Sequence, residues 1–129
     1  MIVLDTHAWV WWVGETGDLS LAAEGSISEA EAIGISTISC WEVAMLVARG
    51  RLELTLEVGR WVGTALAMPR VVALQLDART ATRAGGLDRK TFPGDPADRI
   101  IYATALERGV RLVSQDTGIT KFDPARVVW

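Results

Sequence analysis

Hydrophobic positions along the chain fall into two patterns, short continuous runs and longer stretches with helical spacing. The short, almost wholly apolar runs predict strands buried on both faces; they are Met1–Leu4, Ile33–Ile38, Val71–Leu76, Val110–Ser114 and Val127–Trp129. The longer stretches, bounded by glycine, proline or serine, predict helices; they are Thr6–Val13, Leu21–Glu31, Trp41–Arg49, Val58–Ala67, Ala78–Ala84 and Pro96–Arg108. Because strands and helices alternate, we expect an α/β fold, a three-layer α/β/α arrangement around a central parallel sheet.

Length and composition narrow the class of protein further. A chain of 129 residues suits a single domain over residues 1–129, and half of its residues are hydrophobic with a net charge of only −3, which excludes disorder. The single cysteine, Cys40, excludes an internal disulfide and therefore a disulfide-stabilised secreted domain. No apolar run approaches the roughly 20 residues that span a bilayer, and no signal peptide is visible. We expect a soluble, cytoplasmic protein that does not contact a membrane.

Charge is distributed unevenly between the two parts of the chain. Residues 1–48 carry seven acids and no lysine or arginine, whereas residues 49–129 carry all 13 basic residues and nine acids. Eleven of the basic residues are arginines, whose planar guanidinium groups suit bidentate contact with phosphate. The arginines either pair with local acids or form in part a basic rim for nucleic acid; candidates for such a rim are Arg49, Arg51, Arg83, Arg89 and Arg99.

Four acids stand at junctions between the predicted elements. Asp5 follows the first strand directly, and Asp116 lies shortly after the fourth. Glu42 and Asp98 fall in the first turns of two predicted helices. In an open parallel sheet, ligands bind at the carboxyl ends of the strands, so we expect these four side chains to converge there.

Each acid taken alone also has a structural explanation. A capping box explains Glu42, an N-cap explains Asp95, the helix dipole explains Asp98, and a turn explains Asp116. Asp5 is the hardest to explain in this way, because it ends a very apolar strand with no basic residue nearby in the sequence. A charge close to the core needs a partner, and a metal ion would supply one.

Converging carboxylates point to the chemistry of a divalent cation. They repel one another and resist ionisation unless a positive charge lies between them. Oxygen ligands without a Cys/His cluster favour Mg²⁺ or Mn²⁺ over Zn²⁺, and such an ion can acidify water for attack on a phosphodiester. Phosphodiester hydrolysis is therefore the simplest interpretation. The only histidine, His7, and the six tryptophans are interpreted as structural or interface residues rather than as ligands or base-stacking platforms.

Four segments together resemble the PIN-domain nucleases, and within them the VapC-type ribonuclease toxins of prokaryotic type II toxin–antitoxin systems. These segments are MIVLDTHAWVWW, ISTISCWEVAMLVARGRL, DPADRIIYATALERG and VRLVSQD, and they occur in family order over almost the whole chain. The resemblance implies an endoribonuclease that uses Mg²⁺, for which Mn²⁺ can substitute. Matched by motif, it implies the catalytic and metal-binding residues Asp5, Glu42, Asp98 and Asp116, with Asp95 and Ser114 as candidate accessory residues.

The same resemblance implies a set of partners. These are an RNA substrate, a second copy of the chain in a homodimer, a cognate VapB-type antitoxin, and operator DNA that is reached only through the antitoxin. One departure from the family pattern is visible. Many relatives carry a histidine shortly before the D-P-x-D segment, where this chain has Phe92-Pro93-Gly94.

Three alternatives compete with this interpretation. A haloacid-dehalogenase-like phosphatase would need a second aspartate where His7 stands, and a suitable lysine from Lys90 and Lys121 alone. An inactive PIN-fold interaction module is disfavoured by the complete set of acids. A PIN nuclease of RNA processing is disfavoured by a short chain with no appended domain. The last two alternatives stay open.

Overall fold

The computed structural model describes residues 1–92 and 94–129. Within these residues the five strands are β1 (Ile2–Leu4), β2 (Ile33–Ser36), β3 (Val71–Leu74), β4 (Arg111–Val113) and β5 (Val127–Val128). The helices are α1 (Thr6–Gly14), α2 (Leu21–Glu29), α3 (Thr37–Ala48), α4 (Val58–Leu66), α5 (Ala78–Gly85), α6 (Pro96–Arg108) and α7 (Thr117–Phe122). All five strands and six of these helices were predicted from the hydrophobic pattern; α7 was not. The predicted burial on both faces is wrong for β3, an edge strand in which Val72 is 39% exposed and Ala73 is exposed.

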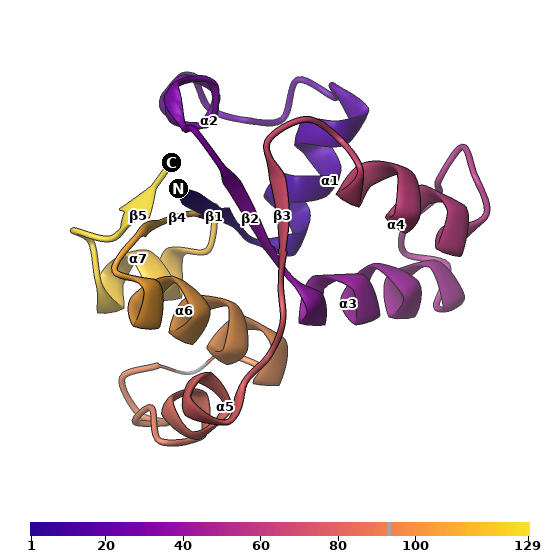
Figure 1. Ribbon diagram of the computed structural model, residues 1–129. Helices are drawn as coiled ribbons and strands as arrows, with labels where there is room; N and C mark the ends of the chain where they lie inside the picture. The colour runs from indigo at the N-terminus through magenta and orange to yellow at the C-terminus, as the bar shows by residue number, and fades with distance from the viewer. Residues whose placement is uncertain (93) are drawn as a thin grey trace.

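The strands form one sheet in the order β3-β2-β1-β4-β5, and every pair is parallel. The first strand lies at the centre, where Leu4 is in register with Ile35 on one side and with Val113 on the other. Because all strands run the same way, their carboxyl ends share one edge of the sheet. The residues that follow β1, β2 and β4 are therefore neighbours, although they are far apart in the sequence (Figure 1).

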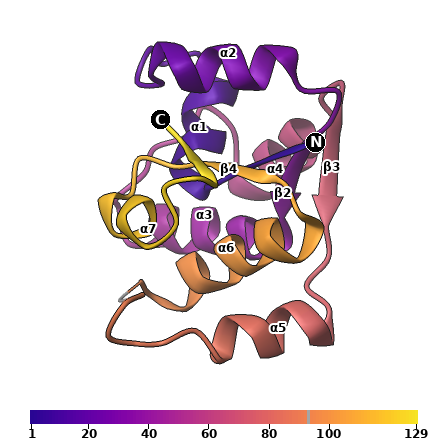
Figure 2. The same ribbon diagram turned by 90° about the vertical axis from the view of Figure 1, so that its left-hand side faces the viewer.

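Helices cover both faces of the sheet, as the predicted three-layer α/β/α fold requires. Alternate residues of β1 point to opposite faces: Ile2 and Leu4 pack with side chains of α1, α2, α3 and α4, whereas Val3 packs with side chains of α6 and α7. Seen from the side, α2 lies above the sheet, while α6 and then α5 lie below it (Figure 2). The central strand is fully enclosed, which explains its uninterrupted apolar sequence.

The boundary between β2 and α3 differs from the prediction. The strand ends at Ser36 and the helix begins at Thr37, so Ser39 lies inside the helix rather than at its N-cap. The predicted capping box with Glu42 is therefore wrong, because Glu42 lies in the second turn of α3. Thr37 and Ile38 are both β-branched and therefore suit a strand. For this reason the sequence pattern does not reveal that the helix begins at Thr37.

The ends of α6 agree with the sequence signals. Asp95 is the N-cap, Pro96 occupies the first turn, and Gly109 closes the helix with a φ of 64°, a left-handed conformation that glycine adopts without strain.

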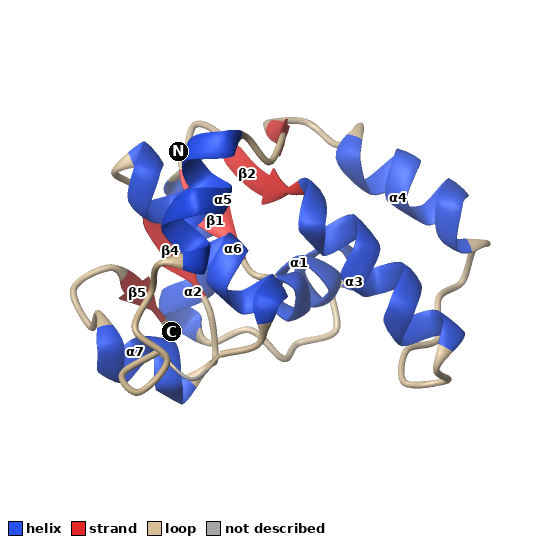
Figure 3. Cartoon of the chain, turned by 90° about the horizontal axis from the view of Figure 1, so that it is seen from below, coloured by secondary structure: helices blue, strands red, loops and turns tan. Residues whose placement is uncertain are grey.

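On the other side of the molecule, α3 and α4 lie side by side and extend beyond the sheet (Figure 3). In the part of the chain that the structure describes, no helix is long and apolar enough to cross a membrane.

Candidate active site

Three of the acids identified in the sequence are helix N-caps at the carboxyl edge of the sheet. Asp5 begins α1, Asp95 begins α6 and Asp116 begins α7. In each, Oδ1 accepts a hydrogen bond from the backbone N–H three residues further on, at 2.8, 2.9 and 2.9 Å respectively. The structural explanation for Asp95 is thus correct. A cap occupies only one carboxylate oxygen, however, so the second oxygen of each residue can take another partner.

All five acids line a single cavity of about 420 Å³, together with His7, Trp11 and Gln115; they are Asp5, Glu42, Asp95, Asp98 and Asp116. Carboxylate oxygens of Glu42, Asp95 and Asp98 lie within 4.8 Å of one another. Asp5, which follows β1, and Asp116, which follows β4, border the same cavity. The ends of these two strands are held together by a hydrogen bond from the N–H of Asp5 to the carbonyl of Val113, at 3.0 Å. The expected convergence of acids from distant segments is therefore present.

Glu42 is held by a residue that the sequence did not single out. The hydroxyl of Thr6 donates a hydrogen bond to Oε1 of Glu42 and is also hydrogen-bonded to the hydroxyl of Ser39, at 3.0 Å. Thr6 and Ser39 are buried, and Glu42 is only 8% exposed. Because these partners are 33 and 36 positions from Thr6, no local spacing rule would have identified it.

Four other carboxylates surround Asp98. Burial of this side chain raises its pKa, and the neighbouring carboxylates raise it further, to about 7; in order of effect these neighbours are Asp95, Glu42, Asp116 and Asp5. A carboxyl group with such a pKa lies in a field that would favour a bound cation. The first turn of α6 is therefore one place in this cavity where positive charge would be stabilising.

Burial also raises the pKa of Asp5 and of Glu42. The hydroxyl of Ser114 and the backbone N–H of Ala8 act against this rise at Asp5, and the hydroxyl of Thr6 does so at Glu42. Ser114 is fully buried, and its Oγ accepts a hydrogen bond from the N–H of Asp116 at 3.1 Å. It thus interacts with two of the acids at once.

Two of the arginines considered for a basic rim have other partners. The guanidinium of Arg99 donates to three backbone carbonyls, those of Ala84, Leu87 and Phe92, and Arg83 forms an ion pair with Glu107 at 2.7 Å. Pairing with an acid is therefore correct for Arg83, whereas the partners of Arg99 are backbone carbonyls, which the sequence did not predict. Arg49, Arg51 and Arg89 are exposed and have no ion pair within residues 1–92 and 94–129.

The aromatic residues divide between core and surface. Trp9 and Trp61 are buried and meet edge to face, with ring centroids 4.9 Å apart, whereas Trp41 is 57% exposed. His7 is exposed and lies in the wall of the acidic cavity, 5.7 Å from the ring of Trp11. The departure from the family pattern at residues 92–94 includes Pro93, which lies outside the described residues.

Comparison with known proteins identifies the family. The model of the PIN domain matches residues 2–124. This chain belongs to the PIN-domain family. It is 39% identical over 115 residues to Ribonuclease VapC22 of Mycobacterium tuberculosis, a match that covers 89% of this chain and 86% of the relative. The resemblance found in the sequence is thereby confirmed.

Solved structures agree with the fold of this PIN domain. A toxin–antitoxin complex from Klebsiella pneumoniae matches with a TM-score of 0.68 and 19% identity, covering 100% of this chain and 97% of the other. VapBC2 from Rickettsia felis, bound to a DNA fragment from its promoter, matches with a TM-score of 0.70 and 16% identity, covering 98% and 97%. Identities this low show the fold alone.

The donor set of this PIN domain fits a divalent cation. The group of three acids whose oxygens lie within 4.8 Å of one another contains only carboxylates, and within the described residues no histidine or cysteine belongs to it. Hard oxygen donors of this kind suit Mg²⁺ and Mn²⁺. Burial and repulsion among the acids raise the pKa of Asp98, and the charge of a cation would offset that repulsion.

Proposed function

We propose that this PIN domain is a Mg²⁺-dependent endoribonuclease, with Mn²⁺ as an effective substitute, that hydrolyses phosphodiester bonds of RNA. The observation that carries the proposal is the convergence of five carboxylates on one cavity, where burial and the other four acids raise the pKa of Asp98 to about 7. The identity of 39% to a named ribonuclease supports RNA as the substrate.

In this proposal the cation is held by Asp5, Glu42, Asp98 and Asp116, and Asp95 lies close enough to assist. When bound, the cation supplies positive charge that makes a water molecule more acidic and stabilises the negative charge developing on the phosphate. The chain's own part is to position these groups. Thr6 fixes the carboxylate of Glu42, and carboxylate oxygens not engaged by the cation or a cap orient the attacking water and accept its proton.

We further propose that the protein is the toxin of a VapBC-type pair in the cytoplasm. It forms a homodimer, is inhibited by a cognate VapB-type antitoxin, and reaches operator DNA only through that antitoxin. Support comes from two structural neighbours, a toxin–antitoxin complex and VapBC2 bound to a DNA fragment from its promoter. Exposed apolar side chains such as Trp41 and Leu56 are compatible with a protein partner.

The proposal is tested by incubating the purified protein with a structured RNA in Mg²⁺ or Mn²⁺. We expect internal cleavage that stops when EDTA is added, and growth arrest on expression that the partner protein relieves. An RNA panel left intact under all metal conditions would contradict the nuclease and favour the inactive interaction module. Cleavage without growth arrest would favour a role in RNA processing over the toxin.

A further inference from the structure

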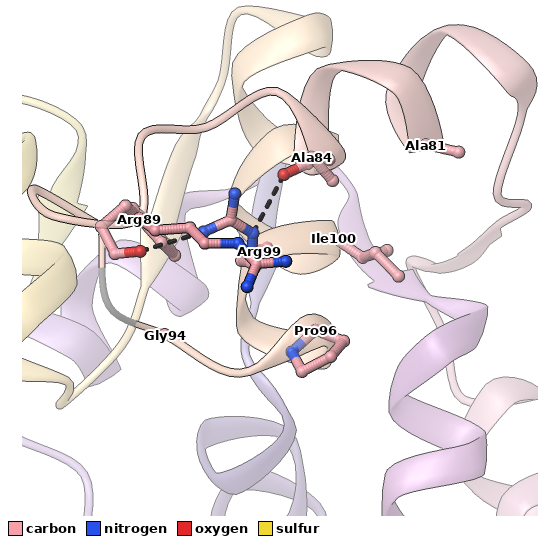
Figure 4. A pocket seen from close by; sticks show the side chains of 9 residues that line it. Ala81, Ala84, Arg89, Gly94, Pro96, Arg99 and Ile100 are labelled. Carbon is pink, nitrogen blue, oxygen red and sulfur yellow. Dashed lines mark hydrogen bonds between the residues drawn. The ribbon is translucent and has the colours of Figure 1, made fainter.

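A second pocket, of about 480 Å³, lies beside the acidic cavity, between α5 and the start of α6 (Figure 4). Ala81 and Ala84 line it from α5, and Pro96 and Ile100 line it from α6. Phe92 also lines the pocket but is only 1% exposed, so it forms part of the floor. The volume falls within the range of about 300–1,000 Å³ that is common for sites of small organic ligands.

This pocket and the acidic cavity each share lining residues with a third, smaller hollow. Phe92 and Gly94 line both the pocket and a smaller hollow of about 270 Å³. The smaller hollow is bordered in turn by Asp95, Asp98 and Asp116, which also line the acidic cavity. The pocket and the cavity are also lined by consecutive residues, Asp95 and Asp98 in the cavity and Pro96 and Arg99 in the pocket. A nucleotide chain whose phosphate lies at the carboxylates would therefore have its neighbouring unit close to the pocket.

Arg99 gives the pocket a rigid, planar wall. Its Nε donates to the carbonyl of Ala84 at 3.1 Å, its Nη1 donates to that of Phe92 at 3.0 Å, and its Nη2 donates to that of Leu87. Its Cζ lies 5.9 Å from the centroid of the Phe92 ring. A guanidinium held in one plane offers its face for stacking with a planar base, a contact that recurs in the recognition of single-stranded RNA.

Arg89 supplies a charge that is available to a ligand. Its side chain extends across the pocket towards Arg99 (Figure 4), and no carboxylate of the described residues pairs with it. The two arginines are the only ionisable residues that line the pocket within the described part of the chain. The apolar walls and the flat guanidinium of Arg99 complement a base, and the unpaired guanidinium of Arg89 complements the phosphate attached to it.

We propose that this pocket binds one nucleotide of the RNA substrate, next to the phosphodiester at the acidic cavity. The base lies between the apolar walls and against the guanidinium of Arg99, while Arg89 contacts the phosphate. This inference rests on the proposed ribonuclease activity. An acidic peptide would satisfy Arg89 but would leave the apolar walls and the flat face of Arg99 without a matching group, so a nucleotide is the better fit.

The first test uses nucleoside monophosphates as probes. AMP, GMP, CMP, UMP and inorganic phosphate are titrated into the full-length protein in EDTA, and amide NMR shifts are followed at Gly85 and Ile100. We expect at least one nucleotide to shift both amides and to bind more tightly than inorganic phosphate. Shifts absent from both amides, or equal affinity for phosphate and all four nucleotides, would overturn the proposal.

Substitution of Arg89 tests the predicted phosphate contact. Arg89→Ala should weaken binding of the preferred nucleotide by about tenfold, as expected for the loss of one charge-assisted hydrogen bond. The matched control is Arg111→Ala, which removes an exposed arginine at the amino end of β4, the opposite edge of the sheet. It should leave the affinity unchanged. Equal affinities for Arg89→Ala and the wild type would contradict the assignment.

A second variant tests the pocket during catalysis without removing a charge. Ala81→Trp places a large side chain at an exposed position in the pocket wall and should raise KM for RNA about tenfold, with Mn²⁺ affinity unchanged. An unaltered KM would overturn the proposal. Failure of the ribonuclease assignment is recognised separately, because the wild type would then cleave no RNA, whereas the nucleotide titration in EDTA needs no cleavage.

Discussion

The hydroxyl of Thr6 donates a hydrogen bond to the carboxylate of Glu42, 36 positions further along the chain. Thr6 is the first residue of α1 and directly follows Asp5, so this bond joins the acid at the end of β1 to the acid on α3. Both partners are buried. The geometry of the acidic cavity therefore depends on a residue that is itself neither acidic nor a ligand.

Replacement of Thr6 should weaken both the fold and the activity. Thr6→Val keeps the shape of the side chain but leaves the Glu42 carboxylate without this donor, which should cost about 1–3 kcal/mol of unfolding free energy. We also expect the rate of RNA cleavage to fall about tenfold. This is the lower end of the range of about 10–100-fold found when residues that orient metal ligands are replaced. Urea unfolding and initial cleavage rates measure the two effects.

Thr104→Val provides the control for this variant. Thr104 is also buried, but its hydroxyl bonds to the carbonyl of Ile100 within α6 and it does not line the acidic cavity. It should lose stability without a matching loss of activity. If both variants lost activity to the same extent, the positioning role of Thr6 would be wrong.

The stability of the metal-free protein should fall as the pH rises from about 4 to about 7. The pKa of Asp98 is about 7 in the folded chain and near its ordinary value of 3.8 in the unfolded chain. Between these values the folded state holds a proton that the unfolded state has released, so folding becomes less favourable as the pH increases. The raised pKa values of Asp5 and Glu42 act in the same direction.

Urea unfolding in EDTA at pH 5.0 and 7.5 would measure this dependence. Asp98→Asn removes the titrating group and should therefore show a smaller difference between the two pH values than the wild type does. If the free energy of unfolding changed by the same amount between pH 5.0 and 7.5 in the wild type and in Asp98→Asn, the raised pKa assigned to Asp98 would be wrong.

A divalent cation should reverse the loss of stability. Because ligands must be deprotonated to bind a metal, Mn²⁺ should raise Tm more at pH 7.5 than at pH 5.0, by mass action on the folded state. Asp98→Asn should show little of this rise. Asp18→Asn, which changes an exposed aspartate outside the cavity, should show all of it. A rise of equal size in both variants would place the metal elsewhere.

Arg99 should matter for stability more than an exposed arginine does. Arg99→Met removes the donor to three carbonyls and should cost about 1–3 kcal/mol for each one that remains buried without a partner. Arg99→Lys should not restore this loss, because an ammonium group lacks the planar fork. Arg111→Met serves as the control in urea unfolding, and a loss as large in that variant would contradict the role assigned to Arg99.

The sequence predicted the layers of this fold better than its junctions. Buried strands such as Ile2–Leu4 are continuously apolar because helices cover both sides, and this pattern is visible in a single sequence. The start of α3 was misplaced because Thr37 and Ile38 suit a strand as well as a helix. The short helix α7 was missed, since its six residues show little apolar periodicity.

The candidate site shows a similar division. Asp5, Asp95 and Asp116 could be placed at junctions from the sequence, but a cap was considered only for Asp95, as an alternative to metal binding, and capping by Asp5 and Asp116 was not foreseen. The structure shows that capping and metal binding are compatible, because each cap uses only one carboxylate oxygen. The roles of Thr6 and Arg99 depend on partners that only the folded chain brings near, so neither could be identified beforehand.

The most direct test of the ribonuclease assignment compares cleavage of one structured RNA, in Mg²⁺ at pH 7.5, by Asp98→Asn and Asp18→Asn. Both substitutions remove one negative charge, but only Asp98 lines the acidic cavity. We predict that Asp18→Asn cleaves at the wild-type rate and that Asp98→Asn, although folded, shows no detectable cleavage. Full activity of a folded Asp98→Asn protein would contradict the assignment.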